Sequence, residues 1–266
     1  MKILKSVGCF MAILFMVGSF TFANVQEVSE AAKAEALLRE AIKTRGGDAY
    51  LKVRTVVGRG TYTAFEKGES GLPTQFVDYV VYPDRERTEF GKGDHKYIQT
   101  NSGEEGWIYE AAQKVIRLQT EEQVKNFKQG LRQDMDHLLK HGWQEQGATL
   151  IYVGRHEVWK NTFSEAIRVE FADGLKVTMH FEPRAKLPLM IEYSGMYKNA
   201  DGEERLGENQ VRFFRWVNFG GIQFPTIQDF YRNGKQTTRV NYDLVNLNVE
   251  VPEKLFAKPN NIKEVK

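Results

Sequence analysis

Two histidines stand at a spacing that could hold a metal ion. His137 and His141 lie four residues apart in the segment HLLKH, so a helix would place both on one face. Zinc hydrolases with such a pair have a glutamate directly after the first histidine. Here Leu138 follows the first histidine and Lys140 precedes the second. A solvated or capping pair is therefore the favoured interpretation, and a metal-dependent hydrolase is the third-ranked alternative.

Other signatures of catalysis are missing from the sequence. The chain contains no nucleophile elbow, phosphate-binding loop or dinucleotide-binding fingerprint. His95, His156 and His180 are scattered, and the acidic groups of the segments GEEG and DGEER fall in expected turns, where solvated carboxylates are usual. We therefore expect no enzyme, no catalytic residues, no cofactor and no metal.

Aromatic side chains are more informative. The chain has 17 Phe, 11 Tyr and 4 Trp, concentrated in segments that predict strands. The segment QVRFFRWVNF is apolar on both faces, with Val211, Phe213 and Val217 at one parity and Phe214 and Trp216 at the other. Packing within a large antiparallel sheet could account for these rings. A curved sheet of this size also has more inner surface than one helix can fill, which favours a cavity.

Most of the chain is predicted to be antiparallel β-sheet. The segment LKVTMHFE alternates, with Val177, Met179 and Phe181 on its apolar face. Asp173-Gly174 and Asn233-Gly234 predict two-residue hairpin turns. We count about ten or eleven strands, mostly in hairpin order. The predicted fold is therefore mainly β with a few helices: a single curved antiparallel sheet or an incomplete β-barrel.

A long helix is predicted between the strands, over residues 120–142. Thr120 and Gln123 form a capping box at its start, and Gly130 lowers the helix propensity of its interior, which favours a helix that bends. Such a helix could cross the mouth of a barrel, either as a fixed plug or as a movable lid. Its apolar stripe consists of Val124, Phe127, Leu131, Met135 and Leu138.

The N-terminus is typical of an export signal. Lys2 and Lys5 precede an uncharged run that ends at Phe20, and the small residue Ala23 supplies a cleavage site. The run is shorter than a membrane-spanning helix requires. We expect 1–23 to be a signal peptide that is removed. An Ala-rich helix is then predicted from Ser29 to the Gly46-Gly47 pair.

The composition of the remaining chain limits its partners and its organisation. Removal of 1–23 leaves equal numbers of basic and acidic side chains, without the basic stripe of a nucleic-acid binder, and it also removes Cys9, the only cysteine. No Pro- or Ser-rich linker divides the chain. We therefore expect residues 24–266 to form one exported domain, without disulfides and without nucleic acid as a partner.

Several short motifs follow one another in a familiar order. The segment YPDRER places Pro83 before Arg85 and Arg87, and GWIYE precedes a polar turn and the strand QKVIRL. Near the C-terminus, Phe256 and Pro259 form a Phe-x-x-Pro motif, FAKP. Preceded by a signal peptide and a helix, this order resembles the periplasmic outer-membrane lipoprotein carrier and sorting family of LolA and LolB over nearly the whole mature chain. Additional strand material at 187–205 departs from the pattern.

The resemblance implies an incomplete β-barrel with a helical lid, whose apolar concave face holds lipid acyl chains. It implies a periplasmic, monomeric carrier of lipoproteins bound for the outer membrane, which meets an inner-membrane transporter and an outer-membrane acceptor. Arg54 and Arg59 are both candidates for the family's functional arginine. An exported interaction or envelope stress-sensing module on the same fold, without lipid cargo, is the alternative. The expected residues of the apolar cavity and lid are Trp107, Tyr109, Val124, Phe127, Leu131, Met135, Val177, Met179, Phe181, Phe213 and Trp216.

Overall fold

The computed structural model describes residues 29–198 and 201–265. The expected signal peptide, 1–23, lies outside these residues. Among the described residues, no helix has both the length and the apolar character needed to cross a membrane.

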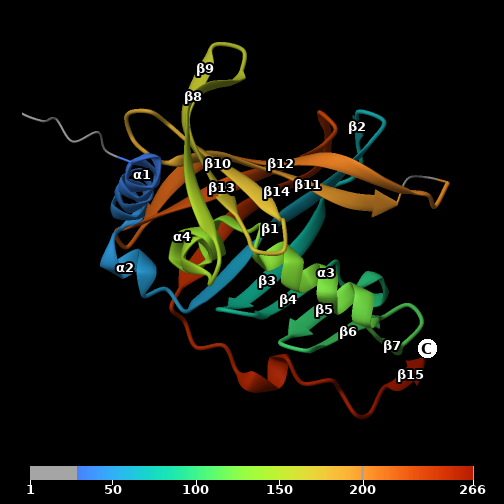
Figure 1. Cartoon of the computed structure of the whole chain (residues 1–266). Helices are drawn as coiled ribbons and strands as arrows, with labels where there is room; N and C mark the ends of the chain where they lie inside the picture. The colour runs from blue at the N-terminus through green and yellow to red at the C-terminus, as the bar shows by residue number, and fades with distance from the viewer. Residues whose placement is uncertain (1–28, 199–200, 266) are drawn as a thin grey trace, which may run out of the picture.

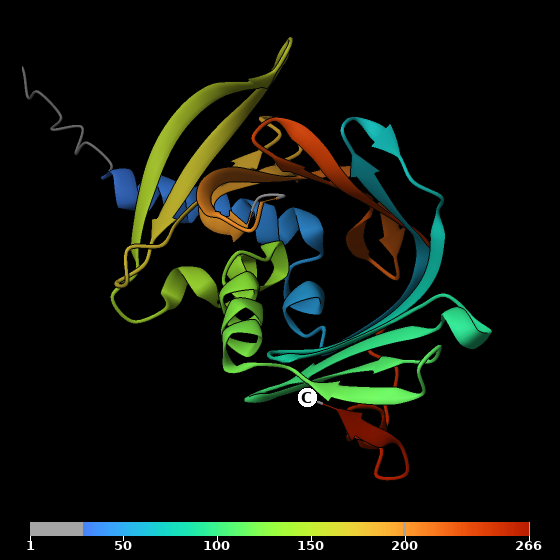
Figure 2. The same cartoon turned by 90° about the vertical axis from the view of Figure 1, so that its right-hand side faces the viewer.

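The described residues form one large curved sheet with helices on its concave side (Figures 1 and 2). Its order is β15-β7-β6-β5-β4-β3-β1-β14-β13-β12-β11-β10-β9-β8, and β2 pairs with β1 alone. The strands are β1 (Thr55–Glu66), β2 (Glu69–Ser70), β3 (Thr74–Val81), β4 (Arg85–Phe90), β5 (Tyr97–Ser102), β6 (Glu105–Glu110), β7 (Val115–Leu118), β8 (Thr149–Trp159), β9 (Thr162–Glu170), β10 (Lys176–Phe181), β11 (Pro188–Lys198), β12 (Glu204–Phe219), β13 (Ile222–Arg232), β14 (Lys235–Leu247) and β15 (Lys263–Val265).

The mainly β fold and its open curved sheet are confirmed, but the predicted number of strands is wrong. The described chain has 15 strands rather than ten or eleven. The shortest strands, β2 and β15, have only two and three residues, and backbone pairing defines them. Segments this short show no alternation of polar and apolar residues from which a strand could be predicted. In addition, β15 pairs with β7 in parallel, whereas the other pairs are antiparallel.

One of the two predicted hairpin turns is confirmed and the other is longer than expected. Asn233 and Gly234 link the paired residues Arg232 and Lys235, as a two-residue turn requires. After β9, the backbone N–H of Phe171 donates to the carbonyl of Leu175 at 2.8 Å, which encloses three residues instead of two. Gly174 occupies the last of these at φ +89°, so the Asp-Gly pair completes a three-residue loop.

The first predicted helix is confirmed, and the second is interrupted. The helices are α1 (Glu30–Arg45), α2 (Asp48–Leu51), α3 (Glu121–Leu131) and α4 (Met135–Lys140), with short 3-10 turns at Gly93–His95, Gly142–Gln144 and Glu253–Leu255. The predicted capping box opens α3. The expected continuous helix over 120–142 is wrong because the Asp134 side chain accepts the backbone N–H groups of Asp136 and His137, which starts a new helix after a break.

The principal core lies between the helices and strands β8 to β13. α1 runs along β8 and contributes Leu38, which is fully buried, while α4 contributes Leu138 and Leu139. Facing them, Val177 and Met179 of β10 have no exposed surface. The alternation that predicts an apolar face on this strand is therefore correct, and that face is the interior of the helix-to-sheet core.

Candidate functional site

A cavity of about 420 Å³ lies between the helices and the concave face of the sheet. Its walls come from β1, β3, β4, β12, β13 and β14, and its remaining side is formed by α3 and α4, which lie at the open side of the curved sheet (Figure 2). Nine of the lining side chains are Phe or Tyr. The rings are Tyr62, Phe76, Tyr82, Phe90, Phe127, Phe213, Phe224, Phe230 and Tyr242.

Strand parity and one glycine bring these rings together. Phe76 and Phe90 are directly opposed partners on β3 and β4, so they project from the same face of the sheet. The ring of Tyr242 stands edge-on to Phe76 and Phe224, with centroid separations of 5.3 and 5.4 Å. Gly58 makes room for it, because a Cβ at this position would lie 2.4 Å from the Tyr242 ring.

The helices contribute the predicted apolar stripe. Phe127, Leu131 and Met135 follow one another at intervals of four residues and line the cavity opposite the aromatic wall. Phe213 of β12 lies in the same lining. These four of the expected site residues therefore share one cavity. Leu138, the last member of the stripe, is buried in the principal core.

Four other expected site residues are core residues outside this lining. Val177, Met179 and Phe181 are fully buried beneath the helices. Trp216 is partly buried at the edge of the same core, where the Arg45 guanidinium carbon lies 5.2 Å from its ring centroid. They belong to the principal core and do not line the cavity.

The remaining three lie elsewhere on the sheet. Trp107 and Tyr109 project from the convex face, where Trp107 is buried with Ile98 and Ile116 and its Nε1 donates to the carbonyl of Phe256 at 3.1 Å. Val124 of α3 lines a separate surface groove that Trp107 borders. The inward parity of β6 is thus occupied by other residues, and the C-terminal segment covers this part of the convex face.

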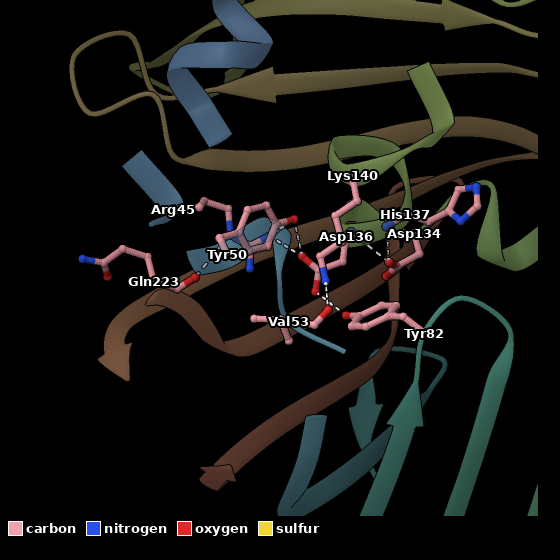
Figure 3. Close-up of polar contacts among 9 residues, drawn as sticks. All are labelled: Arg45, Tyr50, Val53, Tyr82, Asp134, Asp136, His137, Lys140 and Gln223. Carbon is pink, nitrogen blue, oxygen red and sulfur yellow. Dashed lines mark hydrogen bonds and ion pairs between the residues drawn. The ribbon is translucent and has the colours of Figure 1, made fainter. Parts of the chain in front are cut away.

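A buried polar network fixes α4 next to the cavity (Figure 3). Asp136 forms an ion pair with Arg45, the last residue of α1. Its Oδ1 also accepts the Tyr50 hydroxyl at 2.8 Å, and its Oδ2 accepts the Tyr82 hydroxyl at 2.7 Å. Lys140 donates to the carbonyl of Val53 at 3.0 Å. The network thereby joins α4 to α1, α2 and the end of β3.

Electrostatics keep this network charged at its centre. Burial alone would raise the pKa of Asp136, but the charges of Arg45 and Lys140 and the two tyrosine hydroxyls lower it to about 2. Burial raises the pKa of Tyr50 and Tyr82 well above the usual value, so both hydroxyls stay protonated as donors. Asp136 is therefore ionised across the ordinary pH range.

The sequence patterns did not predict this network. Arg54 and Arg59, the two expected functional arginines, are both exposed. The arginine that reaches the helical cover is Arg45, which is 1% exposed. A signal was present, because Arg45 continues the apolar spacing of Ala34, Leu38 and Ala41 on α1. A charged residue on a buried stripe implies a partner of opposite charge.

The cavity wall also contains carboxyl groups. Asp78 of β3 is 9% exposed, and Glu86 of β4 is half-buried beside it. The Thr88 hydroxyl donates to Oδ1 of Asp78 at 2.9 Å. Burial raises the pKa of Asp78 to about 6, and burial together with the neighbouring Asp78 and Asp134 raises that of Glu86 to about 8. The site is therefore aromatic with an acidic portion.

The histidine pair does not form a metal centre with other residues that the structure describes. His137 lines the cavity, and burial and the nearby His141 lower its pKa. His141 is exposed. Across 29–198 and 201–265, no three His, Cys, Asp or Glu side chains are grouped as metal ligands.

Comparisons with known proteins identify the fold. No family model and no curated protein matches the sequence. Among solved structures, a DUF1329 family protein from Desulfovibrio piger matches with a TM-score of 0.55 and 14% identity, over 84% of this chain and 97% of that chain. A LolA superfamily protein from Nitrosomonas europaea matches with a TM-score of 0.53 and 12% identity, over 85% and 97%.

A third structure, a candidate outer membrane lipoprotein-sorting protein domain from Vibrio parahaemolyticus, matches with a TM-score of 0.52 and 12% identity, over 84% of this chain and 97% of that chain. The chain therefore has a LolA-like fold, as the motif order in the sequence predicts. Identities this low establish the fold alone.

Proposed function

We propose that the protein is a non-enzymatic carrier that binds the apolar chain of a lipid or lipoprotein in the cavity under α3 and α4. The observation that carries this proposal is the aromatic cavity itself. Its volume, about 420 Å³, falls in the range of roughly 300–1,000 Å³ common for small-molecule sites. Each methylene group transferred from water into such a site contributes about 0.8 kcal/mol, so an acyl chain gains affinity along its length.

The two helices have different roles in this proposal. α4 is held in place by the Asp136 network and does not move with α3. Every residue of α3 is at least partly exposed, and Lys128 forms an exposed ion pair with Glu104. Exposed ion pairs contribute little, about 0–1 kcal/mol. We therefore assign α3 the role of a lid that swings from the break at 132–134, so that its apolar side covers the empty cavity.

The location and the biological cargo are part of the same proposal. The signal-like segment 1–23 directs export to the periplasm, and residues 24–266 act there as one monomeric domain. The cargo is a lipoprotein bound for the outer membrane, received from an inner-membrane transporter and passed to an outer-membrane acceptor. The LolA-like fold supports this assignment, because one structural neighbour is described as a candidate lipoprotein-sorting domain.

Mass spectrometry tests the proposal directly. Residues 24–266 are expressed in the periplasm and purified without detergent, and native and denaturing spectra are compared. An excess native mass that is lost on denaturation and extracts as lipid supports the carrier. A bare polypeptide mass favours the interaction or sensing module instead, and an excess that matches zinc favours the hydrolase.

Substitution of the lid adds a matched control. Leu131→Asp places a charge in the cavity lining, so we expect loss of bound lipid with the sheet still folded. Leu72→Asp makes the same change at a side chain that is 92% exposed and should leave lipid loading unchanged. Equal loading of the two variants, with circular dichroism spectra matching wild type, would contradict the assignment of the cavity.

A further inference from the structure

The acidic portion of the cavity wall has a defined geometry. On the paired strands β3 and β4, Asp78 lies opposite Thr88 and Val80 lies opposite Glu86. The two carboxyl groups are therefore diagonal neighbours on one face, and Thr88 donates to Asp78 at 2.9 Å and lies 3.5 Å from Glu86. Both line the same cavity as the aromatic rings.

Neither carboxyl group has an internal charge partner in the part of the chain that the structure describes. By contrast, Asp136 pairs with Arg45, and Glu89, on the opposite face of β4, pairs with Arg87 and Lys96. Two unpaired acids in an aromatic wall are costly for the empty protein. A cost of this kind is typical of a functional site, where a ligand supplies the missing charge.

Among the described residues, the basic side chains near Asp78 and Glu86 do not pair with them. Arg85, next to Glu86 in the chain, forms an ion pair with Glu253, and its guanidinium carbon lies 5.2 Å from the Phe256 ring centroid. Partial burial lowers the pKa of His137. The ionisable or charged groups that line the cavity around Glu86 are Tyr62, Asp78, Tyr82, Arg85, Asp134, Asp136, His137 and Tyr242. Acids therefore outnumber cations in the lining.

Resting on the proposed function, we propose that the cavity selects an amphiphile whose apolar chain carries an ammonium group. The ammonium group binds between Asp78 and Glu86, and the chain lies against the rings of Phe76, Phe90 and Phe127. Charge complementarity supports this choice, because the acids would repel an anionic head group, and a neutral head group could not supply the charge that pairs with both carboxylates.

The state of the acids gives the proposal a distinctive readout. Burial and the neighbouring acids raise the pKa of Glu86 to about 8, so the empty cavity holds a proton there at neutral pH. An ammonium ion favours the carboxylate and expels this proton. An alkylamine, with a pKa near that of lysine at about 10.4, remains charged between pH 6 and 9. Its affinity should therefore rise with pH through this range.

A displacement assay compares dodecylamine with dodecanol and dodecanoate, which share one chain length and differ in the head group. Residues 24–266, freed of lipid, are loaded with an environment-sensitive apolar fluorophore, and each competitor is titrated below its micelle concentration at pH 6 and pH 8. At pH 8 we expect the affinity for dodecylamine to exceed that for dodecanol by about tenfold or more. The ratio of the two affinities should be smaller at pH 6. Calorimetry in two buffers of different ionisation enthalpy should show proton release.

Isosteric variants locate the effect. Asp78→Asn with Glu86→Gln should abolish the preference for the amine while dodecanol still binds. Glu69→Gln changes the charge at an exposed residue of β2 and should behave as wild type. Equal affinity of wild type for amine and alcohol, or a preference that survives the double substitution, overturns this inference and leaves the carrier intact. Failure of all three competitors to displace the fluorophore overturns the carrier proposal itself.

Discussion

At the scale of single residues, the most constrained charge is Asp136. It joins residues that are far apart in the chain, because Arg45 lies 91 positions before it. The folded-state pKa of about 2 is below the usual value, so its contribution to stability is present above the unfolded pKa of about 3.9. That contribution is lost only as the pH falls through about 2. Asp136 therefore serves as a permanent charge rather than a pH switch.

Arg45→Met tests this role. The change leaves Asp136 buried without its counter-charge, and breaking a buried pair in this way costs about 3–5 kcal/mol. Urea unfolding monitored by circular dichroism measures the cost. Arg59→Met removes an exposed arginine and should change the free energy of unfolding by less than about 0.5 kcal/mol. The double variant Arg45→Met with Asp136→Leu should recover part of the loss, and no recovery would argue against electrostatic coupling.

At the scale of elements, the break between α3 and α4 divides the helical cover into two functional parts. Before the break, Phe127 and Leu131 of α3 line the cavity without being buried in the core, whereas α4 has Leu138 and Leu139 fully buried. Gly130 precedes the break and lowers the helix propensity at the end of α3. These features would let α3 move while α4 stays in place.

A chemical cross-link can hold α3 closed. Lys128 and Glu104 are in contact across the gap between α3 and the β5–β6 turn, so cysteines at both positions can be joined by a cleavable bis-maleimide. The expected mature chain has no cysteine of its own, which makes the reaction specific. We expect the cross-link to slow lipid exchange, measured with a fluorescent fatty acid, and cleavage to restore it.

The same labelling on either single-cysteine variant is the control, and it should leave exchange at the wild-type rate. An exchange rate that is unaffected by the intact cross-link would show that lipid enters by another route and that α3 is a fixed plug.

At the scale of the whole molecule, the sheet has two faces with separate tasks. Its concave face holds the cavity and the principal core. On the convex face, the C-terminal segment crosses the first strands, where Phe256 is 6% exposed and the backbone carbonyls of Leu255 and Phe256 accept from Arg87 and Trp107. This segment supports the wall from outside without contributing to the cavity lining.

Phe256→Ala should therefore separate stability from binding. Removal of a buried aromatic side chain costs about 3–5 kcal/mol, which thermal unfolding will detect. The lipid content per folded molecule and the preference among head groups should match wild type. Leu118→Ala, at a side chain that is 51% exposed, provides the comparison for a mild change on neighbouring β7. A loss of the head-group preference in Phe256→Ala would show that the two faces are coupled.

Local patterns in the sequence determined the elements of this protein. The capping residues Ser29 and Thr120 begin α1 and α3, and the alternation of residues 175–182 defines the buried face of β10. Asn233-Gly234 forms the hairpin turn between β13 and β14. The order of short motifs was enough to indicate the LolA-like fold, since motif order survives where identity is low. The helix caps, the strand alternation and the hairpin turn depend on interactions between residues close in the chain. They can therefore be predicted from the sequence.

The tertiary structure alone decided which residues line the cavity. Strand alternation assigns side chains to two faces of the sheet but does not say which face is concave. Trp107 was expected to line the cavity and instead lies on the convex face, whereas Phe76 lines the cavity. The pairing of Asp136 with Arg45 and the proximity of Asp78 to Glu86 likewise arise from strand register and helix docking. Both depend on contacts between distant segments, whose geometry is set only when the sheet has curved around its helices.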